Sequence, residues 1–223
     1  MEKSHSPSTF SPFVWGRSLL IAGMFAMGII LYPSLPDTIP THWALDGTID
    51  GWSSKQFGTW IAPGVALAIT LLFPLLRRID PFRDRYAQFR RALDTIQFLL
   101  VAFFAFVFIL QMRSTLLPDA AGEMSRWLLV GLGLFFAIFG NVMGKIRQNY
   151  FIGVRTPWTL SNPEVWVRTH RFTGKVWVVG GLAFSVLAWL GYATNGWALA
   201  GMILLLALGP VVYSYASYRA LSA

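Results

Sequence analysis

The chain has 223 residues, of which 55% are hydrophobic and only 13% are charged, and its formal net charge is +8. Its mean hydropathy of +0.55 is far above that of a soluble domain with one core, so the composition indicates a polytopic membrane protein. The sequence has no cysteine, which excludes disulfides, thiol nucleophiles and thiolate metal sites. Any chemistry must therefore use oxygen or imidazole groups.

Six apolar stretches predict an all-α integral membrane protein with six transmembrane helices. Each stretch is close to the ~20 residues with which a helix crosses about 30 Å of hydrocarbon, where the backbone must satisfy its own polar groups. The turn-forming Thr194-Asn195-Gly196 separates the last two stretches. The predicted spans are 18–36, 56–76, 95–112, 127–144, 175–193 and 197–218.

Positive charge gathers in the connectors on one side of the predicted membrane. With the N-terminus inside, all lysines and arginines except Lys55, Arg113 and Arg126 fall in cytoplasmic segments. The charge therefore indicates topology, with both termini in the cytoplasm, and not direct binding to nucleic acid.

The spans and connectors also define the domain organisation. The basic connector 77–92, which includes Pro81, Tyr86 and Phe89, is suited to lying against anionic lipid headgroups. The divisions are a disordered cytoplasmic tail (1–13), helices one and two (14–76) with a polar outer motif (33–57), a basic cytoplasmic loop (77–92), and helices three to six (93–223) with a polar inner motif (144–175).

The outer motif predicts a small extracytoplasmic hairpin after the first helix. Asp46-Gly47 and Asp50-Gly51 are both turn-forming pairs. His42 with the two aspartates also resembles a set of hard metal ligands, as in a metallohydrolase. We expect no cofactor there, because the turns already explain both aspartates and the predicted topology places no second histidine nearby.

The fourth span ends in a G-x-x-x-G pair, Gly140 and Gly144, which predicts close helix packing around the polar Asn141. No span has an ionisable residue in its middle third, whereas coupled transporters and intramembrane proteases depend on such groups or on a catalytic polar set. This pattern argues against both classes.

The inner motif contains "NYFIGVRTPWTLSNPEVWVRTHR", which predicts a cytoplasmic turn and then an amphipathic helix. Thr156 precedes a proline and must be extended, and Ser161-Asn162-Pro163-Glu164 is typical of a helix start with a small polar cap. The helix either lies at the membrane interface or continues into the fifth span. One face carries Trp166, Thr169, His170 and Thr173, and another carries Glu164, Arg168, Arg171 and Lys175. An aromatic belt with basic residues on lipid phosphates is the alternative interpretation.

Together the two motifs resemble the SdpI (YfhL-like) family of bacterial membrane immunity proteins. The resemblance is carried by "IPTHWALDGTIDGWSSK", which is similar to the family's N-terminal domain of formerly unknown function, and by "NYFIGVRTPWTL" with "VWVRTHR" in an SdpI-like domain over 93–223. Two positions differ from the family pattern: Ala44 stands where asparagine is common, and Pro163 where glutamate is frequent.

The resemblance implies a non-enzymatic protein of the bacterial cytoplasmic membrane that protects the cell from a secreted toxin peptide. It also implies signalling, in which a small transcriptional autorepressor is held at the membrane. A membrane-embedded metal-dependent hydrolase and a toxin or drug exporter remain as alternatives. Besides membrane lipids, the expected partners are therefore a toxin outside and a repressor inside.

The residues expected to face the toxin are Pro40, Thr41, His42, Trp43, Gly47, Asp50, Trp52 and Lys55. The residues expected to bind the cytoplasmic partner are Asn149, Tyr150, Gly153, Arg155, Thr156, Trp158, Trp166, Thr169, His170 and Arg171.

Overall fold

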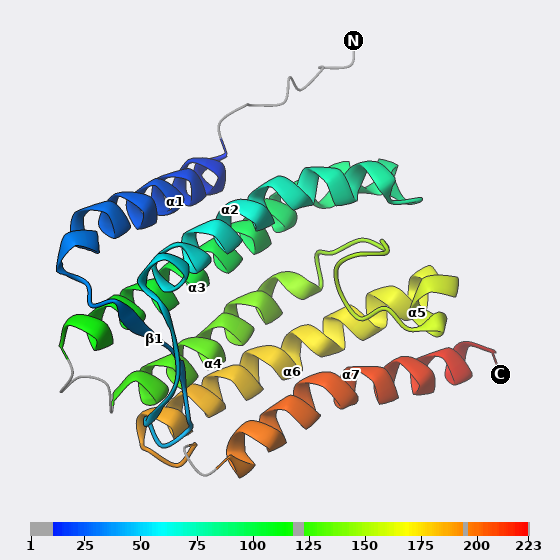
Figure 1. Ribbon diagram of the computed structural model, residues 1–223. Helices are drawn as coiled ribbons and strands as arrows, with labels where there is room; N and C mark the ends of the chain where they lie inside the picture. Colours follow the sequence, from blue (N-terminus) through cyan, green and yellow to red (C-terminus); the bar gives the residue numbers. More distant parts are fainter. Residues whose placement is uncertain (1–10, 118–122, 194–195, 223) are drawn as a thin grey trace.

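The computed structural model describes residues 11–117, 123–193 and 196–222. Within these residues, six long helices lie side by side in a bundle (Figure 1), and each is long and apolar enough to cross a membrane. The predicted membrane protein is thus mostly helical, with six helices that could span the membrane. The helices are α1 (Pro12–Leu31), α2 (Lys55–Ile79), α3 (Arg90–Leu116), α4 (Met124–Met143), α6 (Pro163–Trp189) and α7 (Trp197–Ser222).

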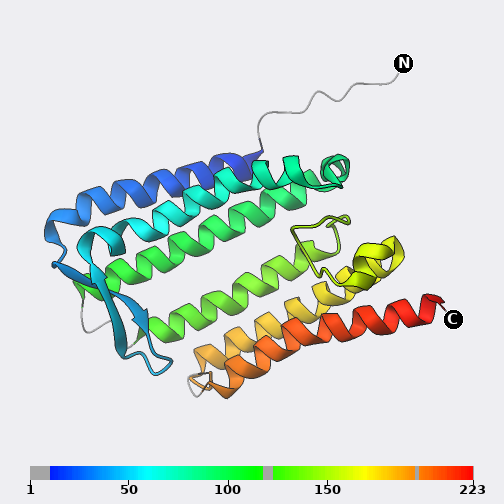
Figure 2. The same ribbon diagram turned by 45° about the vertical axis from the view of Figure 1, so that its right-hand side comes forward.

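Shorter elements occupy the two ends of the bundle. An antiparallel hairpin connects α1 to α2, and a short helix precedes α6 at the opposite end (Figure 2). Most of the predicted tail, and Thr194 and Asn195 of the predicted last turn, lie outside the described residues. The short elements are η1 (Tyr32–Ser34), β1 (Thr38–Trp43), β2 (Ile49–Ser54), η2 (Arg83–Phe89) and α5 (Pro157–Ser161).

The bundle has two halves that share a core at the end where α5 lies. In one half, α1, α2 and α3 enclose a core that includes Ile39 of the hairpin and Phe108 of α3. In the other half, α4, α6 and α7 enclose Phe184 and Leu206. A third cluster joins α3 to α4 and α6 through Trp166. The inner motif is therefore part of the structure that links the two halves.

Glycines hold α4 and α6 in close contact along most of their length. A Cβ added to Gly140 would lie 2.8 Å from the carbonyl oxygen of Gly174, and one added to Gly181 would lie 2.5 Å from the carbonyl oxygen of Gly133. Each helix thus uses glycines seven residues apart, which return to the same face after two turns. The predicted G-x-x-x-G contact is closest at Gly140. Gly144 and Asn141 are exposed, and a Cβ added to Gly144 would lie at an ordinary contact distance of 3.5 Å from Cγ of Arg171 on α6.

α6 begins inside the inner motif and continues as one helix through the fifth span. The Asn162 side chain accepts hydrogen bonds from the backbone N–H groups of Glu164 (2.8 Å) and Val165 (3.3 Å), as an N-cap residue does. Pro163 occupies the first turn, where its missing N–H costs nothing. Of the two arrangements left open by the sequence, the continuous helix is the one present.

The basic loop predicted at 77–92 is largely helical. α2 extends through Pro63 and Pro74 as far as Ile79, and η2 follows after a short turn. Tyr86 and Phe89 are buried in the core shared by the two halves, so the expectation that they contact lipid is wrong. Residues three apart eclipse one another in a 3₁₀ helix, and η2 therefore turns both rings inward together.

Candidate functional site

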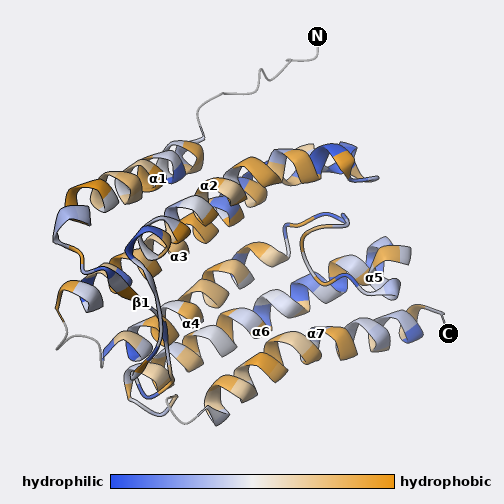
Figure 3. Cartoon of the chain, in the orientation of Figure 1, coloured by the Kyte–Doolittle hydropathy of each residue, from blue (hydrophilic) through white to orange (hydrophobic). Residues whose placement is uncertain are grey.

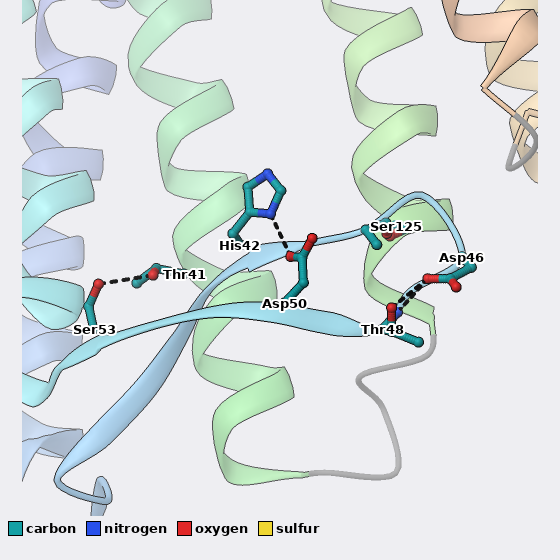
Figure 4. A network of polar contacts seen from close by, with 8 residues as sticks. Thr41, His42, Asp46, Thr48, Asp50, Ser53 and Ser125 are labelled. Carbon is teal, nitrogen blue, oxygen red and sulfur yellow. Dashed lines mark hydrogen bonds and ion pairs between the residues drawn. The ribbon is translucent and has the colours of Figure 1, made fainter.

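The hairpin of the outer motif turns at Asp46-Gly47, as predicted. Asp46 Oδ1 accepts hydrogen bonds from the Thr48 N–H (2.9 Å) and the Thr48 hydroxyl (2.7 Å), and Gly47 has a φ of +93° (Figure 4). The Thr48 N–H is the main reason that the pKa of Asp46 is lowered, because it stabilises the ionised carboxylate. The turn therefore accounts for the position of this aspartate.

Asp50 does not form the second turn that the sequence suggested. It lies in β2, where its Oδ1 is 2.5 Å from Nδ1 of His42 on β1, and Gly51 faces His42 across the sheet (Figure 4). Both members of the pair are accessible, since the His42 side chain is 72% exposed and that of Asp50 is 47% exposed. The turn interpretation was wrong here because it considered neighbours in sequence and not the opposite strand.

Hydrogen bonds attach the hairpin to both halves of the bundle. The Gln111 side chain on α3 donates to the Pro40 carbonyl at 3.1 Å, and the Ser125 hydroxyl on α4 donates to the Ala44 carbonyl at 2.6 Å. Ala44 therefore serves through its backbone, although its side chain departs from the family pattern. The hairpin is held across the end of the bundle as a bridge between α3 and α4.

At the other end of the bundle, Asn149 stabilises the connector between α4 and α5. Its side-chain amide donates to the carbonyls of Arg147 (2.8 Å) and Ile152 (3.0 Å). Its side-chain oxygen accepts from the N–H groups of Phe151 (2.9 Å) and Ile152 (2.7 Å). Asn149 is completely buried. Its side chain thus provides hydrogen-bond partners for backbone N–H and C=O groups of the connector, which has no helix or strand to pair them.

His170 is buried beneath this connector. Its Nε2 accepts the Val154 N–H at 3.1 Å, so Nδ1 carries the proton and donates to the Trp166 carbonyl at 2.8 Å. Its ring stacks on the Trp166 indole at 3.9 Å between centroids, and that indole donates to the Ile146 carbonyl at 2.9 Å. Both ring nitrogens are in use, so this imidazole is a structural group and not a free base.

Thr156 starts a short helix that the sequence analysis missed. The Thr156 hydroxyl accepts the Thr159 N–H, and the Thr159 hydroxyl accepts the Thr156 N–H, which together form a capping box at the start of α5. The Thr156 hydroxyl also lies 3.1 Å from the Ser214 hydroxyl on α7. The pattern T-P-x-T, with a capping residue and proline in the first turn, could have indicated this helix. Trp158, which was expected in a turn, lies on α5 with its ring 5.0 Å from that of Tyr215 on α7.

Asp80 is the main residue of this site that sequence reasoning did not identify. It is only 2% exposed, and its carboxylate accepts hydrogen bonds from the Tyr86 hydroxyl (2.7 Å), the Tyr150 N–H (3.0 Å) and the Phe82 N–H (2.7 Å). These bonds attach the inner motif to the end of α2 and to η2. In the sequence it is a lone acid directly before Pro81, a pattern that gives no signal of contacts with distant segments.

Comparison with known proteins identifies the family of this chain. The family model described as SdpI/YfhL protein family matches residues 145–214, and the one described as Domain of unknown function (DUF1648) matches residues 19–67. The immunity protein SdpI of Bacillus subtilis (strain 168) is 35% identical over 203 residues, which are 90% of this chain and 92% of that protein. The chain belongs to the SdpI/YfhL family. No solved structure matches it.

As a member of the SdpI/YfhL family with six spanning helices, the chain is a multi-pass bacterial membrane protein. The DUF1648 match covers most of α1, the hairpin and about half of α2. The SdpI/YfhL match begins in the connector after α4 and includes α5, α6 and most of α7. Each polar site thus lies within one of the two matched regions.

Part of the outer motif of this SdpI/YfhL protein maintains the hairpin itself. Pro40 and Gly47 are buried, and Trp43 is half-buried. The Thr41 hydroxyl lies 3.0 Å from that of Ser53, and Lys55 donates to a backbone carbonyl of the same connector at 2.8 Å. The residues that remain accessible are His42, Asp50 and Trp52, the last with 58% of its surface exposed.

The inner motif divides in the same way. Tyr150, Arg155 and Arg171 are exposed, and Trp158 is half-buried. Arg155 also donates to the Tyr150 carbonyl at 2.7 Å, which fixes it over the connector. The buried members are Asn149, Thr156, Trp166, Thr169 and His170.

The metal interpretation gains no support from the residues that the structure describes, since no three His, Cys, Asp or Glu side chains come together there. His42 meets Asp50, whereas Asp46 is engaged by Thr48. The outer motif therefore presents a polar pair on a rigid hairpin.

Proposed function

We propose that this protein confers immunity to a secreted toxin peptide that acts on the bacterial membrane. The observation that carries the proposal is its 35% identity, over 90% of the chain, to a relative named as an immunity protein. Nearly the full length of both chains is covered, so the likeness includes the spanning helices as well as both polar motifs.

The proposed orientation places both termini and the inner motif in the cytoplasm and the hairpin outside. α1 begins and α7 ends at the end of the bundle where α5 lies, and hydrophilic residues collect there (Figure 3). Among the residues that the structure describes, all lysines and arginines except Lys55, Arg113 and Arg126 belong to segments at that end. An excess of basic residues in short loops favours the cytoplasmic side. A C-terminal fusion to a reporter that is active only outside the membrane should remain inactive.

In this orientation the hairpin is the surface that meets the toxin. His42, Asp50 and Trp52 offer an imidazole, a carboxylate and an indole on one small sheet whose position is fixed by α3 and α4. Such a preorganised surface orders few groups on binding a peptide and so loses little entropy.

The inner motif then serves as a cytoplasmic surface for a small transcriptional autorepressor. Tyr150, Arg155 and Arg171 supply exposed aromatic and basic groups, and Trp158 adds a partly accessible indole. Aromatic and arginine side chains are the types that dominate binding energy at protein interfaces. The buried members of the motif support this surface from beneath.

The test is survival of a toxin-sensitive bacterium that expresses the protein, challenged with secreted antimicrobial peptides. Wild type should protect, alanine at His42 or Trp52 should reduce protection, and membrane abundance should not change. Alanine at Arg155 should affect the response of a repressor-controlled reporter more than survival. Protection that is absent at full wild-type abundance would refute the proposal. Stoichiometric zinc, or peptide efflux driven by the proton gradient, would instead support a hydrolase or an exporter.

A further inference from the structure

A basic cavity of about 510 Å³ lies at the end of the bundle that holds α5. It is bounded by η2 and the start of α3, by the end of α4 and the residues after it, and by α6. The charged residues that line it are all basic and all exposed, and none forms an ion pair with another part of the chain that the structure describes. They are Arg90, Arg91, Lys145, Arg147 and Arg171.

A second cavity, of about 450 Å³, continues from the first along the outside of the α4–α6 contact. The two share Gly144 and Arg171 in their walls. From there the second cavity passes Gly140 and Gly174, with the exposed Asn141 and Lys175 also in its wall, and reaches Val178 and the largely exposed Val179. The combined shape has a cationic mouth, a further cation at Lys175, and a mainly apolar groove that runs along the spanning helices.

The charges in its wall distinguish the cavity beside Arg171 from the other basic cavity at the same end of the bundle. That cavity, of about 700 Å³ between α1, α2, η2 and α3, also contains several arginines, but Asp84 and Asp94 stand among them and reduce its positive potential. The cavity beside Arg171 has no carboxylate in its wall. Mutual repulsion among five cations is relieved when an anion binds between them.

We propose that the cavity beside Arg171 binds the phosphate headgroup of an anionic phospholipid, with one acyl chain in the groove along α4 and α6. Guanidinium groups donate paired, charge-assisted hydrogen bonds to phosphate oxygens, and basic pockets between spanning helices suit such headgroups. A soluble phosphate would use only the mouth. An acidic peptide would match the charge, but it would leave the apolar groove empty.

The bound lipid would connect the two halves of the bundle. Arg90 and Arg91 belong to the α3 half, whereas Lys145, Arg147 and Arg171 belong to the half formed by α4, α6 and α7. A phosphate between them replaces repulsion across the junction with attraction on both sides. This role does not depend on the proposed immunity function.

The experiment is native mass spectrometry of the full-length protein in detergent, titrated separately with phosphatidylglycerol, phosphatidylcholine and inorganic phosphate. We expect one phosphatidylglycerol to bind in preference to phosphatidylcholine. Arg91→Gln and Arg171→Gln, from opposite walls, should each weaken it about fivefold, the effect of one cation near a phospholipid surface. Arg219→Gln removes the same charge from the same end of the bundle but outside the cavity, and it should bind as wild type does.

A second variant tests the groove independently of charge. Gly144 is exposed and lies in the wall of both cavities, so Gly144→Leu should obstruct the passage between them and weaken phosphatidylglycerol binding at least as much as loss of one arginine. Equal binding of the two lipids, or unchanged binding in the Arg91→Gln/Arg171→Gln double variant, would overturn the proposal. Full competition by inorganic phosphate or by a soluble acidic peptide would overturn it in favour of those ligands.

Discussion

Replacing Gly153 by alanine should destabilise the inner motif more than an ordinary glycine substitution would. Gly153 has a φ of +114°, in the region that residues with a Cβ rarely adopt. A Cβ at this position would overlap Nε2 of His170 and lie 3.1 Å from its Cδ2. The imidazole cannot retreat easily, because its ring stacks on the Trp166 indole and its Nδ1 donates to the Trp166 carbonyl.

Two costs combine in this variant. Backbone strain from the positive φ costs about 1–3 kcal/mol. Displacing His170 leaves the Val154 N–H without its acceptor, and an unsatisfied buried donor costs a further 1–3 kcal/mol or so. The expected loss in the free energy of unfolding is therefore about 2–6 kcal/mol.

The measurement is unfolding of the purified protein in mixed detergent micelles, followed by circular dichroism and by tryptophan fluorescence. Gly191→Ala is the matched control: Gly191 has a φ of +84°, but a Cβ there meets no described atom within 4 Å. The control should show the strain alone. If the two variants lose the same stability, the contact between Gly153 and His170 does not contribute, and the reasoning fails.

Three further predictions use the same unfolding assay. Asp80→Asn removes the negative charge from the acceptor of three hydrogen bonds and should lower the free energy of unfolding by about 1–3 kcal/mol. A variant as stable as wild type would show that Asp80 does not hold the inner motif in place. His42→Ala and Asp50→Ala break an exposed pair and should each cost less than about 1 kcal/mol while lowering survival in the toxin challenge, so a large stability loss would contradict a binding role. Gly140→Ala should push α4 and α6 apart and lower the free energy of unfolding by about 1–3 kcal/mol. Gly201→Ala, where a Cβ meets no described atom, should be neutral or stabilise by up to about 1 kcal/mol, and similar effects at the two positions would refute close packing.

Local signals predicted the features that depend on neighbouring residues in the chain. The Asp46-Gly47 turn and the helix start at Asn162 rest on hydrogen bonds spanning two or three residues. The i,i+4 pair of Glu164 and Arg168 forms at 2.8 Å for the same reason. Such contacts are specified by sequence spacing alone.

Errors arose where a contact crosses between distant segments. Asp50 was interpreted from the glycine beside it, but its partner is His42 on the opposite strand. Tyr86 was interpreted from the arginines around it, but its hydroxyl is bonded to buried Asp80. In both cases the local composition was correct, and the direction of the side chain was decided by what lay across the fold.

The sequence by itself determined that this chain has six helices long and apolar enough to cross a membrane and that it belongs to the SdpI/YfhL family, because hydrophobic length and a dense polar motif are properties of the linear chain. Tertiary structure alone decided which motif residues are available to partners. It buried Asn149 and His170 in hydrogen bonds and left Arg155 and Arg171 accessible. It also brought basic residues from three segments around one cavity. Burial and convergence depend on packing between segments far apart in the chain, which local patterns do not encode.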